Sequence, residues 1–181
     1  MNILLIKHGK TDYNLEGKRQ GRTDLPLNEM GKKEVLKLKK KIKRQTEIVF
    51  SSPLKRATQT AQLLFPDEEI TIDKRLIEYD FGELEGIPFS TPLEKFPDNK
   101  IEEYNGKTFL MPKNGETFDD IVSRCREFLA YPNKSFKNTA EIAIVTHSTN
   151  FEILKALVEK KPWHTYLANA KQFHGFVEIK I

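Results

Sequence analysis

Residues 2–7 read Asn-Ile-Leu-Leu-Ile-Lys and are followed at once by His8 and Gly9. The run is rich in leucine and isoleucine and does not alternate with polar residues, which is typical of a strand buried on both faces of a parallel sheet. Two further runs, residues 47–51 and 142–146, have the same character. These three runs predict the central strands of an α/β fold.

Helical patterns lie between the strand runs. Apolar residues recur at helical spacing over residues 28–44, 53–64, 117–129 and 149–159, and weaker strands are expected at 70–73 and 176–181. Ser52 before Pro53 predicts an N-cap with proline at the first helical position, and Thr149 with Glu152 predicts a capping box. The alternation of strands and helices predicts a three-layer α/β/α sandwich with a mostly parallel central sheet.

The chain of 181 residues is long enough for one domain with a sizeable core, so we expect a single domain over residues 1–181. Residues 87–116 break the alternation, because several prolines lie among aromatic residues there. Long irregular segments on a compact domain tend to be functional. We therefore expect this segment to be a lid or insertion that forms the wall of a substrate pocket.

Composition narrows the partners and the compartment. A hydrophobic content of 38% with 31% charged residues is typical of a soluble globular protein. Apolar runs fall short of the roughly 20 residues of a membrane helix, and the single cysteine, Cys125, agrees with a reducing compartment, so a cytoplasmic protein without a membrane partner is expected. We interpret Cys125 as a core residue.

The net charge of +4 raises the possibility of a nucleic-acid partner. The densest basic cluster, residues 37–44, however, is interspersed with apolar residues at the spacing of an amphipathic helix, so it is interpreted as a solvated helix face. We therefore expect no nucleic-acid partner. A mild positive charge also attracts small anionic substrates.

Two of the four histidines, His8 and His147, directly follow two of the strand runs. Ligands of open α/β sheets bind beyond the carboxyl ends of the strands, so both rings are expected at one edge of the sheet. A lone histidine after a strand is more often structural, but the joint placement favours a site. Beside His8, Gly9 lets the backbone approach an anion, and Thr11 supplies a hydroxyl and an amide.

Arg56 lies in the first turn of the helix expected after the second strand run. A helix N-terminus favours anions, and the planar guanidinium binds phosphate through two parallel hydrogen bonds. Cations that come from separate strand ends are what a phosphate dianion requires. His8 and His147 could also bind zinc, but no third ligand is evident, so we expect a site without a metal or another cofactor.

These residues resemble the histidine phosphatase superfamily, the group that includes the cofactor-dependent phosphoglycerate mutases, over almost the whole chain. Five motifs in the family's order carry the resemblance: Lys7-His8-Gly9 with Thr11, Asn14, Gly17, Arg19, Gln20, Gly21, Asp24, Pro26, Leu27 and Gly31; Ser51-Ser52-Pro53 with Arg56, Ala57, Thr60 and Ala61; Glu78-Tyr79-Asp80-Phe81-Gly82 with Glu85-Gly86; Gly115-Glu116 with Arg124; and Thr146-His147-Ser148.

The resemblance implies a role for each matching residue. His8 would be the nucleophile that becomes phosphohistidine, Arg56 and His147 would hold the transferring oxygens, and Glu78 would protonate the leaving group and later take a proton from water. A protonated His147 would stabilise the developing charge. The positions that match substrate-binding residues of the family are Lys7, Thr11, Asn14, Gln20, Gly21 and Ser148.

The sequence departs from the family at two positions, because Lys7 stands where the family has arginine and Lys10 where it often has Glu or Gln. A lysine keeps the positive charge but lacks the bidentate fork of arginine. The departures leave open a phosphate-ligand sensor without turnover. The presence of Glu78 argues against a sensor, since a sensor needs no proton donor.

The expected function is therefore hydrolysis of a small phosphorylated metabolite. Mutase-type phosphoryl transfer is the alternative within the family, but the mutases are longer and carry extra arginines for a substrate carboxylate, whereas residues 87–116 contain only lysines as cations. The expected assembly is a monomer or a homodimer. His164 and His174 match no motif and are interpreted as structural.

Overall fold

The central sheet of the protein has five strands, and its helices lie on both sides. The computed structural model describes residues 2–43, 45–104, 106–135, 140–164 and 175–180. The strand order is β3 (Ile70–Ile72), β2 (Ile48–Ser51), β6 (Glu141–Thr146), β1 (Asn2–Lys7) and β7 (Phe176–Lys180). All neighbouring pairs are parallel except β1 with β7. The predicted α/β class with a mostly parallel sheet is confirmed.

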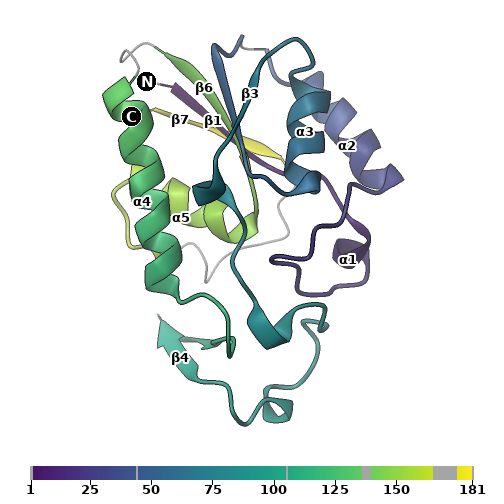
Figure 1. Cartoon of the computed structure of the whole chain (residues 1–181), viewed down its shortest axis with the longest axis vertical. Coiled ribbons are helices and arrows are strands. Elements are labelled where there is room, and N and C mark those ends of the chain that lie inside the picture. Colours follow the sequence, from purple (N-terminus) through teal and green to yellow (C-terminus); the bar gives the residue numbers. More distant parts are fainter. Residues whose placement is uncertain (1, 44, 105, 136–139, 165–174, 181) are drawn as a thin grey trace.

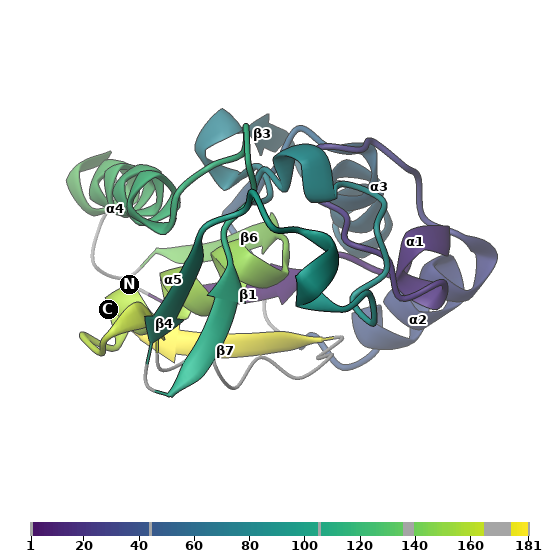
Figure 2. The same ribbon diagram turned by 90° about the horizontal axis from the view of Figure 1, so that it is seen from below.

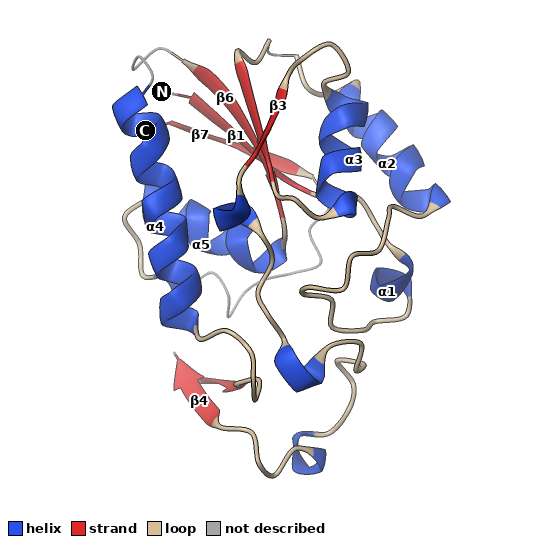
Figure 3. Cartoon of the chain, viewed as in Figure 1, coloured by secondary structure: helices blue, strands red, loops and turns tan. Residues whose placement is uncertain are grey.

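Within the described ranges, two helices pack on each face of the sheet (Figures 1 and 3). Helices α2 (Glu29–Lys39) and α3 (Lys55–Leu64) pack on one face, where Leu4 and Ile6 point. Helices α4 (Phe118–Ser135) and α5 (Ser148–Val158) pack on the other, where Ile3 and Leu5 point. Because both faces of β1 are buried, its sequence is a continuous apolar run. None of the helices within the described ranges has the length and apolar character needed to cross a bilayer.

A small antiparallel sheet lies apart from the main one. Its strands β4 (Ile101–Tyr104) and β5 (Lys107–Leu110) pair within the proline-rich stretch, and both views place this hairpin beyond the carboxyl ends of the main strands (Figures 1 and 2). The described residues also include three 3₁₀ helices, η1 (Lys74–Leu76), η2 (Gly82–Leu84) and η3 (Leu93–Lys95), and a short helix α1 (Asp12–Leu15). The sequence patterns predicted neither the hairpin nor these short helices.

The predicted start of α3 is wrong by two residues. The helix begins at Lys55 with Leu54 as its N-cap, and no side chain caps it. Ser52, the expected cap, instead has its hydroxyl oxygen 2.6 Å from Nε2 of His147. A polar group that the sequence assigned to the helix therefore contacts His147 instead.

The predicted capping box of α5 is also wrong. His147 occupies the N-cap position without a side-chain cap bond, and Ser148 begins the helix. The amide of Thr149 donates to the carboxylate of Glu78 at 3.3 Å, so a residue distant in sequence, and not Glu152, satisfies this helix end. Sequence patterns of local capping do not reveal such a long-range cap.

Two helix ends also differ from prediction. Helix α2 ends at Lys39 and not at Arg44, and in the turn that follows the amides of Lys41 and Ile42 donate to the carbonyl of Leu38. Helix α4 continues to Ser135 and contains a proline that would ordinarily end it. Cys125 is fully buried in α4, as predicted, and its burial raises the pKa of the thiol to about 12.

Candidate active site

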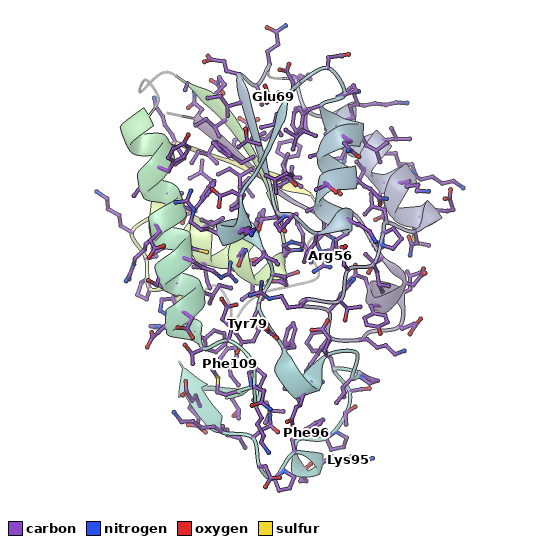
Figure 4. The ribbon with its side chains drawn as sticks, viewed as in Figure 1. Arg56, Glu69, Tyr79, Lys95, Phe96 and Phe109 are labelled. Atoms are coloured by element: carbon purple, nitrogen blue, oxygen red, sulfur yellow. The ribbon has the colours of Figure 1, made fainter. Side chains whose placement is uncertain are left out.

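Three of the predicted site residues come together at the carboxyl ends of three strands. His8 follows β1, His147 follows β6, and Arg56 lies in the first turn of α3 after β2. The rings of His8 and His147 have centroids 5.0 Å apart, and Nε of Arg56 donates to Nδ1 of His147 at 3.1 Å. Figure 4 labels Arg56 at the end of α3 nearest the small hairpin, with Tyr79 between it and Phe109 of β5. The side chains of His8, Arg56 and His147 are all buried.

The contacts of His8 fix which ring nitrogen can react. Nδ1 lies 2.6 Å from the carbonyl oxygen of Gly9. A carbonyl only accepts, so Nδ1 carries the proton, and in a neutral imidazole the lone pair is on Nε2. The amide of Gly9 donates to Thr60 at 3.0 Å, and a Cβ on Gly9 would lie 2.7 Å from Val35, so only glycine fits here. Nε2 of His8 is the nucleophilic atom that this geometry offers.

His147 is held as a neutral ring. Because Arg56 donates to Nδ1, the proton of the ring lies on Nε2, which donates to the hydroxyl of Ser52 at 2.6 Å. Burial, together with the adjacent charge of Arg56, lowers the pKa of His147 well below its usual range. The structure therefore favours a neutral His147, which differs from the protonated stabiliser expected from the sequence. A neutral ring accepts a hydrogen bond from Arg56 and does not repel it.

The guanidinium of Arg56 is fully buried and held on three sides. Nη2 donates to the carbonyl of Gly21 at 2.7 Å, Nη1 donates to that of Thr23 at 2.9 Å, and Nε donates to His147. Burial lowers its pKa to about 10, and the charge of Glu78 opposes the shift. These contacts account for three of the five N–H donors of the group. Both terminal nitrogens therefore keep a further N–H that could bind a phosphate oxygen.

Glu78 is a buried acidic residue whose charge acts on nearby cations. Oε1 accepts from the amide of Tyr79 at 2.8 Å, and Oε2 accepts from Thr149 in the first turn of α5 at 3.3 Å. Its charge acts on both Arg56 and Lys7. A lone acidic residue after a weak strand is usually solvated, so the resemblance alone singled out Glu78. The charges of Arg56 and Lys7 also act on His147, so these two cations connect Glu78 with that histidine.

Lys7 is the last residue of β1 and is partly buried. Burial lowers the pKa of its ammonium, and the charges of Glu78 and Glu152 oppose this shift. Lys7 also contributes to the lowered pKa of His147. Glu152 of α5, whose charge acts on Lys7, was not predicted as a residue of the site. Burial raises the pKa of its carboxyl group, against the charges of Lys155 and Lys7.

Three of the expected substrate-binding residues form one network. The hydroxyl of Thr11 lies 2.5 Å from Oε1 of Gln20 and 3.2 Å from Oδ1 of Asn14. Nε2 of Gln20 donates to the carbonyl of Thr23 at 3.3 Å. The same carbonyl accepts a hydrogen bond from Nη1 of Arg56. These bonds orient both amide oxygens toward Thr11, so the amide nitrogens are the groups that can donate elsewhere.

Other highlighted residues have different surroundings. Ser148 begins α5, directly after His147. The ammonium of Lys10 forms an ion pair with Glu34 of α2 at 2.7 Å. The ring of His164 lies 5.5 Å from that of Trp163. His174 lies outside the described residues.

Two residues that contact this network were not predicted as residues of the site. Ser52 receives the hydrogen bond of His147, and Glu85 accepts from the backbone amides of residues 21–23. Both lie inside motifs of the family resemblance, and that resemblance was the sequence signal that connected them with the site. Neither has a composition or spacing pattern that predicts its contact.

Comparison with known proteins gives a consistent family and fold. A model of the histidine phosphatase superfamily (branch 1) matches residues 3–177. An uncharacterized phosphatase, PhoE, from Bacillus subtilis is 32% identical over 158 residues, 84% of this chain and 74% of the relative. A metal-independent phosphoserine phosphatase of Arabidopsis thaliana is 31% identical over 152 residues, 80% of this chain and 63% of the plant protein.

A similar solved structure is the phosphoserine phosphatase of Entamoeba histolytica in complex with 3-phosphoglyceric acid. It superposes with a TM-score of 0.77 at 26% identity, over 98% of this chain and 89% of the other. Its sheet and helices therefore follow the same path as those described here.

Proposed function

This chain belongs to the histidine phosphatase superfamily and is a phosphomonoesterase of that type, and we propose that it hydrolyses a small phosphorylated metabolite through a phosphorylated His8, without a metal ion. The observation that carries the proposal is the orientation of His8, whose Nδ1 bond to Gly9 leaves the lone pair on Nε2. Arg56 and His147 lie beside this ring. The similarity to named phosphatases supports hydrolysis over mutase chemistry.

In the first step, Nε2 of His8 attacks phosphorus and the bond from phosphorus to the ester oxygen breaks. Glu78, in its protonated form, gives its proton to that oxygen, so that an alcohol leaves. Lys7 and the remaining N–H groups of Arg56 bind the phosphoryl oxygens. His147 keeps Arg56 in place through Nδ1, and its contribution is that of a neutral ring.

In the second step, Glu78 as the carboxylate takes a proton from water. The water oxygen attacks phosphorus, the bond from phosphorus to Nε2 breaks, and inorganic phosphate leaves with His8 restored. Glu78 thus returns to its protonated form, and one cycle consumes one ester and one water. The burial of Glu78, and the action of its charge on Arg56 and Lys7, support a role beside the groups that bind the phosphoryl oxygens.

We further propose that the chain is a single domain in which residues 87–116 form the lid over the substrate. The hairpin of this segment lies beyond the carboxyl ends of the main strands (Figure 2). Phe109 of β5 packs against Phe118 at 5.4 Å between ring centroids, and Phe118 stacks on Tyr79 at 5.5 Å. Tyr79 follows Glu78 directly, so these aromatic contacts connect the proposed lid with the residue next to the proposed proton donor.

Activity is expected to be unchanged in the presence of EDTA. The described residues contain no group of three His, Cys, Asp or Glu side chains arranged to hold a metal ion, and the proposed charge stabilisers are Arg56 and Lys7. The measurement is release of inorganic phosphate from a panel of phosphorylated metabolites, including phosphoserine and 3-phosphoglycerate, with and without chelator. Loss of activity in EDTA that added Mg²⁺ or Zn²⁺ restores would contradict the metal-independent mechanism. Isomerised product without phosphate release would indicate a mutase.

Substitution of Lys7 tests its proposed place in the phosphate site. Lys7→Ala is expected to weaken inhibition by inorganic phosphate and to lower kcat/KM, because the dianion loses one counter-charge. Lys7→Arg is expected to raise kcat/KM about tenfold, equivalent to roughly 1.4 kcal/mol of transition-state stabilisation. The measurement is steady-state kinetics on one aryl phosphate together with phosphate inhibition constants.

The pH dependence gives a second measure of Lys7. Burial lowers the pKa of its ammonium, so the protonated form that binds phosphate is lost at a lower pH than for an ordinary lysine. Activity should therefore fall on the alkaline side, and Lys7→Arg should move this fall to higher pH because a guanidinium stays protonated. Lys10→Arg is the matched control, since Lys10 pairs with Glu34. Unchanged kinetics and phosphate inhibition in Lys7→Ala would exclude Lys7 from the site.

A further inference from the structure

The carboxylate of Glu85 is connected to Arg56 through a short loop, residues 21–23. Oε1 accepts from the amides of Gly21 and Thr23 at 2.8 and 3.0 Å. Oε2 lies 3.1 Å from the amide of Gly21 and 3.3 Å from that of Arg22. Three consecutive backbone amides therefore converge on one carboxylate, which holds the loop by its N–H groups.

The carbonyl groups of the same loop hold Arg56. The carbonyl of Gly21 accepts from Nη2 at 2.7 Å, and that of Thr23 accepts from Nη1 at 2.9 Å. The negative charge of Glu85 also acts on the guanidinium and opposes the effect of burial on its pKa. The loop thus connects a carboxylate on one side to a guanidinium on the other through backbone bonds alone.

The backbone around Glu85 explains how the carboxylate reaches the loop. The segment that follows it pairs with the segment before the loop, through bonds of 2.9 Å from Gly86 to Arg19 and from Arg19 to Ile87. Gly21 approaches closely, because a Cβ there would stand 2.1 Å from the carbonyl oxygen of Tyr79 and 2.9 Å from Oε2 of Glu85. Only glycine permits this approach.

We propose that Glu85 is a positioning residue for phosphoryl transfer, because it clamps residues 21–23 and thereby sets the direction in which Arg56 presents its remaining N–H groups to phosphate. The inference rests on the proposed function, since it requires Arg56 to bind the phosphoryl oxygens. Arg56 also holds Nδ1 of His147. Loss of the hydrogen bonds from the loop to Glu85 would therefore change the orientation of both Arg56 and His147. Glu85 acts through these groups and does not contact the reacting atoms.

The first test is Glu85→Gln. Glutamine offers one acceptor oxygen and turns an NH₂ group toward backbone N–H groups, so the loop should loosen. We expect kcat/KM on an aryl phosphate to fall, and the inhibition constant of inorganic phosphate to rise, each by about tenfold to one hundredfold, the size of a lost charge-assisted hydrogen bond. Asp73→Asn is the control, since it alters a partly buried carboxylate bonded to Arg75. It should lower thermal stability without changing phosphate inhibition.

The second test asks whether the effect passes through Arg56. A lysine at position 56 cannot bind both loop carbonyls and His147, so in an Arg56→Lys background Glu85→Gln should change kcat/KM by less than about twofold. The same loss factor in both backgrounds would indicate a merely structural role and overturn the proposal.

A third measurement does not depend on turnover. Imidazole ¹⁵N spectra of the unliganded protein should show the His147 signals change in Glu85→Gln and stay as in the wild type in Asp73→Asn. Unchanged His147 signals in Glu85→Gln would overturn the positioning role. A wild-type protein that hydrolyses no phosphomonoester would overturn the proposed function, and these spectra would still test the clamp. Normal wild-type activity with unaltered kinetics in Glu85→Gln would overturn the clamp alone.

Discussion

Replacement of His8 by asparagine is expected to lower kcat on any phosphomonoester by about 10⁴-fold or more, because the proposed covalent step has no other nucleophile. Asparagine is the preferred replacement, since its amide can still donate to the carbonyl of Gly9 that holds Nδ1. Rapid quench of the wild-type protein with ³²P-labelled substrate should trap an acid-labile phosphoryl group. Mapping of the modified peptide should place the label on His8.

The matched control is His164→Asn, since His164 packs near Trp163 and has no role in the proposed mechanism. This variant should trap the same label as the wild type. Label on serine or on His147, or turnover without any trapped label, would contradict the assignment of His8. Retained phosphate binding without turnover in the wild-type protein would instead favour the sensor.

The sequence predicted the sheet well because burial on both faces leaves a clear signal. Residues 2–7 form β1 with the predicted bounds, and the runs that became β2 and β6 differ by one residue at one end. A strand between two helical layers is apolar at its buried central positions on both faces, so its pattern needs no knowledge of its neighbours. The convergence of His8 and His147 follows from the same rule, since parallel strands end at one edge.

The helix ends were less predictable because long-range contacts replace local caps there. The hydroxyl of Ser52 accepts a hydrogen bond from His147, and Ser52 is not the N-cap of α3. The amide of Thr149 donates to the carboxylate of Glu78. Both partners are far away in sequence, so no local pattern contains them. The two errors share one cause, which is that the polar groups near these helix starts bond to groups of the site.

The charge state of His147 is a further property that the sequence did not give. From residue type alone, a histidine beside a phosphate site is expected to be protonated. The structure places the N–H of Arg56 against Nδ1 and buries the ring, and both effects favour the neutral form. Ring orientation and burial decide this property, and neither can be read from the motif Thr146-His147-Ser148.

Replacement of Glu78 by glutamine is expected to slow alkyl phosphates by about 10²–10⁴-fold, the usual contribution of general acid catalysis. An alkoxide leaves poorly without a proton, whereas an aryl oxide departs without help, so aryl phosphates should lose far less in the step that breaks the ester bond. The measurement is the ratio of kcat/KM for an alkyl and an aryl phosphate in the wild type and in Glu78→Gln.

The control for this variant must remove a nearby charge without removing the proposed acid. Glu152→Gln does so, because Glu152 is a partly buried carboxyl group of α5 whose charge acts on Lys7, as that of Glu78 does. It should leave the ratio between alkyl and aryl substrates unchanged. Glu78 also binds the first turn of α5 through Thr149, so thermal unfolding of both variants has to be measured. An equal loss for alkyl and aryl substrates in Glu78→Gln would mean that Glu78 supports the helix and does not donate the proton.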